Sequence, residues 1–111
     1  MFFYSKPNPS ELPKVLRDAV PTTMFIIVKI KQNKFGTTNG KKTDTITLAP
    51  HNDKRNKKRQ QFMFGVERGK VKVGDFILEC TCTNKTGLIE SFKFLATPLD
   101  VFEFRKRVIG K

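Results

Sequence analysis

The sequence predicts an all-β (mainly β) fold: a small five-stranded barrel with a short N-terminal helix and a C-terminal helix. Apolar and polar residues alternate with a period of two in five segments, turn residues separate these segments, and the interior has almost no helical periodicity. A five-stranded sheet of this size protects its edges best by closing into a barrel. With 111 residues, we expect an N-terminal arm over 1–9 and one domain over 10–111.

The first element of that domain is a predicted helix of about two turns, ending near Pro21. Ser10 serves as its N-cap, and Glu11 and Pro13 lie in its first turn. Apolar residues then recur at helical spacing, at Leu12, Val15, Leu16 and Ala19.

The five predicted strands cover 24–32, 43–48, 60–66, 76–83 and 88–96, with turn residues over 36–42 and a basic loop over 50–59. In the first strand Val28 and Ile30 point inward, whereas Lys29 and Lys31 point outward. The chain has no Trp and few Leu, so phenylalanines must supply much of the core. We expect most of these five to be buried: Phe62, Phe64, Phe76, Phe92 and Phe94.

The last segment fits two patterns. Residues 101–104 alternate like a strand. However, Thr97, Pro98 and Asp100 supply an N-cap, a proline at the first helical position and an acid in the first turn. We therefore predict a helix here.

Cys80 and Cys82 form a C-x-C pair. In a strand they would lie about 6.5–7 Å apart, which is poor geometry for a disulfide. We expect reduced, buried thiols and an intracellular protein. With one histidine and no second cysteine pair, the sequence offers no metal-ligand set, and we expect no metal or other cofactor.

Basic residues are concentrated in one part of the chain. The net charge is +12, and residues 29–72 hold thirteen of the 22 Lys and Arg but only three acids. In a barrel the first three strands are neighbours, so these charges converge as in a polyanion-binding surface. The predicted nucleic-acid-binding residues are Lys29, Lys31, Lys34, Phe35, Lys41, Lys42, Lys54, Arg55, Lys57, Lys58, Arg59, Arg68, Lys70, Lys72 and Lys85.

Two of these predictions have alternatives. The run from Lys54 to Arg59 also fits a solvated loop or a nuclear localisation signal, which would place the protein in a nucleus or at a viral replication site. For base stacking, Phe35 is the first candidate because it lies among basic residues at a strand end, and Phe25 and Tyr4 follow.

Over residues 24–97 this pattern resembles an OB-fold, with Gly74-Asp75 opening the fourth strand. The resemblance implies oligonucleotide binding across strands two and three and through two loops. It places Lys34, Phe35, Lys41 and Lys42 in the first loop and Asn84 and Lys85 in the other. On the sheet face it places Thr45, Thr47, Gln61 and Met63. Glu67–Val73 is too short for the helix that many OB domains have between strands three and four.

The sequence therefore predicts a single-stranded DNA-binding protein without strong sequence preference, resembling viral or phage proteins that act in replication, recombination or genome handling. It predicts no enzyme, because His51 is alone, the carboxylates are scattered and Asp75 reads as a turn residue. One alternative is a structural protein, a virion or complex subunit that docks its basic face on an acidic partner. Another is an RNA-binding or ribosome-associated protein.

Two further expectations concern the chain ends and membranes. No apolar run approaches the ~20 residues of a membrane span, and Met1–Pro7 lacks the pattern of a secretory signal. We therefore expect no membrane insertion. The arm residues Phe2, Phe3 and Tyr4 offer a contact through which copies of the chain would associate as a homo-oligomer.

Overall fold

The computed structural model describes the backbone of residues 1–38, 40–51 and 60–109, and their side chains except those of 35–38 and 109. The protein is mainly β, as predicted, but the described residues form six strands instead of five. The strand order in the sheet is β1-β6-β5-β2-β3-β4. The unpredicted strand is β1, Phe2–Phe3, which is too short to show any periodicity. Its residues belong to the segment that we expected to be an arm.

The chain divides into two compact units. The terminal unit comprises Met1–Met24 and Phe76–Lys111, and the central unit comprises Phe25–Asp75. The strand β2, Pro21–Thr38, contributes residues to both units. The terminal unit also contains β1, β5 (Phe76–Thr83), β6 (Ile89–Leu95) and α1 (Pro98–Ile109). The central unit also contains β3 (Lys41–Pro50) and β4 (Gln61–Glu67).

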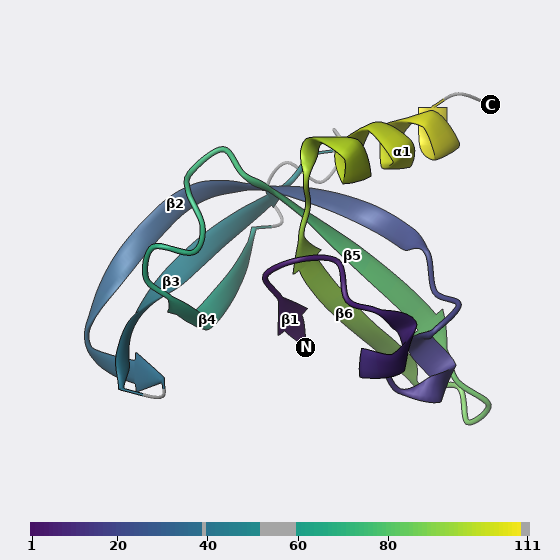
Figure 1. The fold of residues 1–111 in the computed structure, drawn as a ribbon, viewed down its shortest axis with the longest axis horizontal. Helices are drawn as coiled ribbons and strands as arrows, with labels where there is room; N and C mark the ends of the chain where they lie inside the picture. The colour runs from purple at the N-terminus through teal and green to yellow at the C-terminus, as the bar shows by residue number, and fades with distance from the viewer. Residues whose placement is uncertain (39, 52–59, 110–111) are drawn as a thin grey trace. The chain divides into compact units, whose positions relative to one another are not determined.

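In the terminal unit β5 and β6 form an antiparallel hairpin, and β1 adds to β6 in parallel (Figure 1). Phe92 and Phe94 point into the core, as predicted, and the Phe3 ring packs edge-on against Phe92 with centroids 6.0 Å apart. Phe76 is half-buried against the same core. The buried members of this core are Leu12, Leu16, Met24, Leu78, Cys80, Phe92, Phe94, Val101 and Phe104.

The predicted N-terminal helix of about two turns does not form as one continuous helix. The segment forms two separate 3₁₀ turns, η1 (Pro9–Glu11) and η2 (Lys14–Leu16), and the residue preceding η1 is Asn8, not Ser10. Pro13 lies between the turns and keeps the preceding Leu12 extended, at φ −107° and ψ 149°, which interrupts the helix. Leu12 and Leu16 are nevertheless buried. The apolar spacing therefore identified these core residues correctly, although the backbone conformation that it predicted is different.

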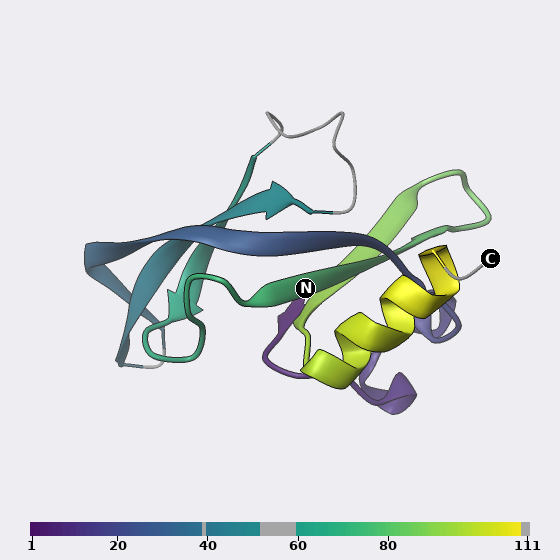
Figure 2. The same ribbon diagram turned by 90° about the horizontal axis from the view of Figure 1, so that it is seen from above.

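The C-terminal segment is the helix α1, and the strand alternative is wrong. Thr97 caps it reciprocally, because the Asp100 amide donates to Thr97 Oγ1 at 3.2 Å while the Thr97 amide donates to Asp100 Oδ2 at 2.9 Å. Val101 and Phe104 are buried in the terminal unit, whereas Phe102 is 62% exposed. Leu12 and Leu16 of the N-terminal segment belong to the same core cluster as Val101 and Phe104 of α1, the helix that Figure 2 shows from above.

Both cysteines are free thiols, and only Cys80 is fully buried while Cys82 is half-buried. The expectation that both are buried therefore holds for Cys80 alone. Burial raises the pKa of the Cys80 thiol to about 11, against the weaker opposing effect of the Lys6 and Arg107 charges.

We expect iodoacetamide at pH 8 to alkylate Cys82 before Cys80. With its pKa at about 11, Cys80 carries only about one thiolate per thousand molecules at that pH, and the thiolate is the nucleophile. Mass spectrometry of peptides after timed alkylation measures both rates, with urea-unfolded protein as the control. Equal rates in the folded protein would contradict the burial of Cys80.

In the central unit β2, β3 and β4 are antiparallel (Figure 1). The pairing of Thr38 with Lys41 leaves a two-residue hairpin connection, so the strands extend into the segment that we expected to be a turn over 36–42. Gly40 has a positive φ of 76°, which suits a tight hairpin turn.

Two β-bulges overturn predicted side-chain directions. In β2 Ile27 pairs with Leu48 and Lys29 with Thr47, so Val28 is an extra residue. Val28 is 41% exposed, which corrects the prediction that it points inward. Beyond the bulge Ile30 pairs with the buried Ile46 and is half-buried, as predicted.

The second bulge lies in β4 and changes the surface of the protein. Asp44 pairs with Val66, but Ile46 pairs with Met63, so β4 has one more residue than β3 over this interval. Gly65 supplies the positive φ of 70° at the bulge. Val66 is buried, whereas Phe62 is 58% and Phe64 is 77% exposed. The prediction that these two phenylalanines belong to the core is therefore wrong.

Candidate nucleic-acid interface

The positive charge of the protein is concentrated in the central unit. Its sequence carries thirteen Lys and Arg and four Asp and Glu, which is +9 of the total of +12. The terminal unit holds the remaining +3. A charge imbalance of this size in one compact unit attracts polyanions.

Strand register places lysines and an aromatic ring on the same face of the central unit. Thr47 of β3 pairs with Lys29 of β2 on one side and with Phe62 of β4 on the other. Directly opposed residues of antiparallel strands point to the same side of a sheet. The next row on this face pairs Lys31 with Thr45. We call this side of the sheet, with Lys29, Lys31, Thr45, Thr47 and Phe62, the open face; Lys29, Lys31 and Phe62 are exposed, whereas Thr45 is half-buried and Thr47 is 8% exposed.

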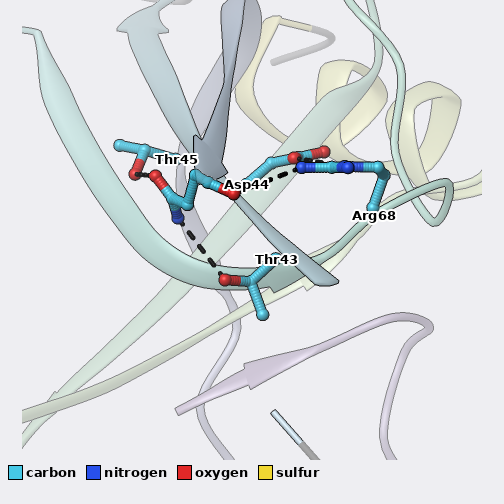
Figure 3. Close-up of polar contacts among 5 residues, drawn as sticks. Thr43, Asp44, Thr45 and Arg68 are labelled. Carbon is cyan, nitrogen blue, oxygen red and sulfur yellow. Dashed lines mark hydrogen bonds and ion pairs between the residues drawn. The ribbon is translucent and has the colours of Figure 1, made fainter. Parts of the chain in front are cut away.

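Side-chain hydrogen bonds hold β2 against β3 beside these rows, where the register becomes irregular. The Asn33 amide nitrogen donates to Thr43 Oγ1 at 3.4 Å, and the Thr45 hydroxyl donates to Asn33 Oδ1 at 3.0 Å (Figure 3). These bonds occupy polar groups that would otherwise be buried without a partner. They fix the position of Thr45 on the open face.

Arg68 has a structural role within the central unit. Its Nε donates to Asp44 Oδ1 at 2.9 Å, and the Asp44 side chain is only 7% exposed (Figure 3). A second guanidinium nitrogen donates to the Asn33 carbonyl at 3.5 Å. Arg68 thus joins the end of β4 to β2 and β3, and we regard it as a residue that positions the sheet.

Lys41 is also engaged, through an ion pair with Glu67 of 2.8 Å. The hydrogen bond between them raises the pKa of Lys41 and lowers the pKa of Glu67, so both groups are charged at neutral pH. Lys41 is therefore a partly compensated cation. Lys29 and Lys31 are exposed and carry the charge of the open face.

The other predicted site residues fall into three groups. Lys34, Lys42, Lys70 and Lys72 are exposed in the central unit, outside the paired rows of the open face. Lys85 is exposed in the turn between β5 and β6 of the terminal unit. The remainder lie outside the described residues: Lys54, Arg55, Lys57, Lys58, Arg59 and the side chain of Phe35.

Two other predictions about this surface need correction. Phe25 is 2% exposed and belongs to the core, so it is not a stacking residue. Gln61 and Met63, which the OB resemblance placed on the sheet face, pair with the buried Leu48 and Ile46 and therefore lie on the opposite face. Tyr4 is 40% exposed, but it lies in the terminal unit with its ring 5.1 Å from that of Phe2.

The exposure of Phe62 and Phe64 was not predicted from the sequence. Burying a phenylalanine is worth about 1.5–3 kcal/mol, so two exposed rings on one short strand are costly unless a partner uses them. The signal that could have found them is Gly65, since a glycine inside a strand often marks a bulge.

Within residues 1–38, 40–51 and 60–109, no three His, Cys, Asp or Glu side chains are grouped closely enough to hold a metal ion. Asp75 accepts a hydrogen bond from the Lys72 amide at 2.8 Å, which fits the turn role expected of it.

No helix among the described residues has the length and apolarity to span a membrane.

No protein-family model matches the chain, and no curated protein or solved structure is significantly similar to it.

Proposed function

We propose that the protein binds single-stranded nucleic acid, with DNA favoured over RNA and without strong sequence preference, through the open face and the exposed aromatics of β4. The observation that carries the proposal is the row of Lys29, Thr47 and Phe62, beside the exposed Phe64. Lysines bind phosphates by charge, and phenyl rings stack on bases of any identity. A protein of this kind serves replication, recombination or genome handling.

The aromatic rings favour single strands over duplexes. In a duplex the base faces are already stacked on their neighbours, so Phe62 and Phe64 gain contacts only with unpaired bases. Adjacent strands lie about 4.8 Å apart, which puts Lys29 and Phe62 about 10 Å apart across β3. A nucleic-acid strand lying over β3 would place its phosphates near β2 and its bases over β4.

Replacing both Lys29 and Lys31 by alanine is expected to reduce the salt dependence of binding. Each lost phosphate contact on a single strand lowers the slope of log K against log salt by about 0.7, so the double variant loses about 1.4. Fluorescence anisotropy with labelled oligo(dT) over a range of salt concentrations measures this slope. The matched control is Lys14→Ala with Lys106→Ala, two exposed lysines of the terminal unit.

The slope also tests the proposal itself. A wild-type affinity that does not change with salt, or an identical slope in the wild type and the open-face variant, would overturn it. Competition with single- and double-stranded DNA and RNA then ranks the ligands. A preference for RNA would instead support the alternative that the protein binds RNA.

A protein partner is the second candidate function. Its support is the solvent side of α1, where Leu99 is 63% and Phe102 is 62% exposed beside basic residues. On this alternative the protein is a subunit of a larger complex or of a virion and docks on an acidic partner. The N-terminal segment extends the idea to self-association, because Tyr4 is 40% exposed beside the half-buried Phe2 and Phe3. Light scattering of the full chain and of a chain starting at Ser10 measures that association, and we expect the shorter chain to lose it.

A further inference from the structure

The turn between β5 and β6 is rigidly built. Asn84 Oδ1 accepts hydrogen bonds from the Thr86 amide at 2.9 Å, the Thr86 hydroxyl at 2.6 Å and the Leu88 amide at 3.1 Å. Two backbone bonds close the turn, from the Asn84 amide to the Leu88 carbonyl and from the Gly87 amide to the Asn84 carbonyl. Most of the donors and acceptors of the turn are thus paired with one another, and its conformation is preorganised.

This rigid turn presents two aliphatic side chains to solvent. Leu88 is 66% and Ile89 is 75% exposed, the latter at the first residue of β6. Turns are usually polar, so two adjacent exposed aliphatic residues at this position are unusual. The exposed Lys85 lies in the same turn, and no Asp or Glu occurs from 83 to 89. The turn therefore combines a positive charge with the exposed pair Leu88 and Ile89 where it joins β6, and we call this pair the apolar tip.

We propose that this tip is a wedge that packs against the exposed face of a base pair where a duplex meets a single strand. The inference rests on the proposed function. Base faces are the broad apolar surfaces of nucleic acids, and in a continuous duplex they are covered on both sides. Leucine and isoleucine are among the residues that proteins insert at interrupted base steps. Lys85 is placed to bind a phosphate beside that step.

The role differs from that of Phe62 and Phe64. An aliphatic side chain has no π-face, so Leu88 and Ile89 cap or separate a base step by burying apolar area. Because the turn is already ordered, little conformational entropy is lost on insertion. The wedge would unpair bases at the junction and so supply single strand for binding.

The test uses a forked DNA carrying 2-aminopurine at its last paired position, whose fluorescence rises when it unstacks. The full chain should raise this signal, and the Leu88→Ser, Ile89→Ser double variant should lose at least half of the rise. Its affinity for oligo(dT) should stay within about twofold, since the phosphate and stacking residues are intact. The control is Leu99→Ser with Phe102→Ser, equally exposed in the same unit, which should leave the fork signal unchanged.

The outcomes separate the wedge from the proposed function. A tip variant that opens the fork as well as the wild type overturns the wedge but leaves single-strand binding intact. A tip variant that loses oligo(dT) affinity in the same proportion as the fork signal also overturns it. If the wild type binds neither ligand, the proposed function itself fails. Circular dichroism confirms that each variant is folded, and Lys85→Ala, which leaves the apolar tip in place, should weaken fork binding without abolishing the opening.

Discussion

Replacement of both Phe62 and Phe64 by alanine is expected to weaken oligo(dT) binding by about thirtyfold or more. Base stacking on an aromatic ring contributes about 1–3 kcal/mol per base, and a loss of 2 kcal/mol corresponds to about thirtyfold in Kd. The salt slope should not change, because no cation is removed. Stability should be almost unaffected, since the rings are 58% and 77% exposed.

Anisotropy titrations at one salt concentration measure the loss in affinity, and urea unfolding checks the fold. Phe102→Ala is the matched control, because Phe102 is 62% exposed and lies in the terminal unit. An unchanged affinity in the double variant would contradict the stacking role. So would a similar loss in the control, because it would show a general effect of removing exposed phenyl rings.

Replacing Arg68 by methionine is expected to destabilise the protein by about 2–3 kcal/mol. Removing one partner of a buried ion pair costs about 3–5 kcal/mol, and the 30% exposure of the Arg68 side chain lowers the expected value. The Asp44 carboxylate would be left without its partner in a site where its side chain is only 7% exposed. Urea unfolding of the wild type and the variant measures the difference in the free energy of unfolding.

Two variants sharpen this test. Lys41→Met removes the exposed ion pair with Glu67 and should change stability little. Arg68→Met combined with Asp44→Asn should recover part of the loss, because the unpaired buried charge is gone. If Arg68→Met has the same free energy of unfolding as the wild type, Arg68 does not stabilise the sheet. It would then be a candidate for binding phosphate, like the exposed lysines.

Most strands and the C-terminal helix could be predicted from the sequence, because apolar alternation and helix capping are local signals. The C-terminal helix and the five long strands overlap the segments predicted from the Thr97 cap and apolar periodicity, although β2 and β3 extend into the predicted turn over 36–42. The N-terminal helix is interrupted because Pro13, which was read as a first-turn residue, keeps the preceding Leu12 extended. The strand β1 could not be seen, since its partner β6 is distant in sequence.

The residues of the candidate site could be predicted only in part, because β-bulges change which side chains face solvent. The concentration of charge in the central unit follows from counting residues, and Lys29 and Lys31 were correctly expected to point outward. A bulge, however, reverses the side-chain direction of every residue after it, and alternation alone does not show which residue is extra. The misplacement of Val28, Phe62 and Phe64 follows from this ambiguity. The ion pair of Arg68 with Asp44 depends on tertiary contact and has no local signal.

The bulge at Gly65 also determines how β4 would tolerate sequence change during evolution. A residue with a side chain would be strained at the φ of 70° found at this position. Deleting the glycine would relieve that strain and restore strict alternation, but it would also turn the phenyl rings toward the face that Ile46 and Leu48 line. Loss of this one codon in a descendant lineage would therefore replace an exposed aromatic surface by a larger core.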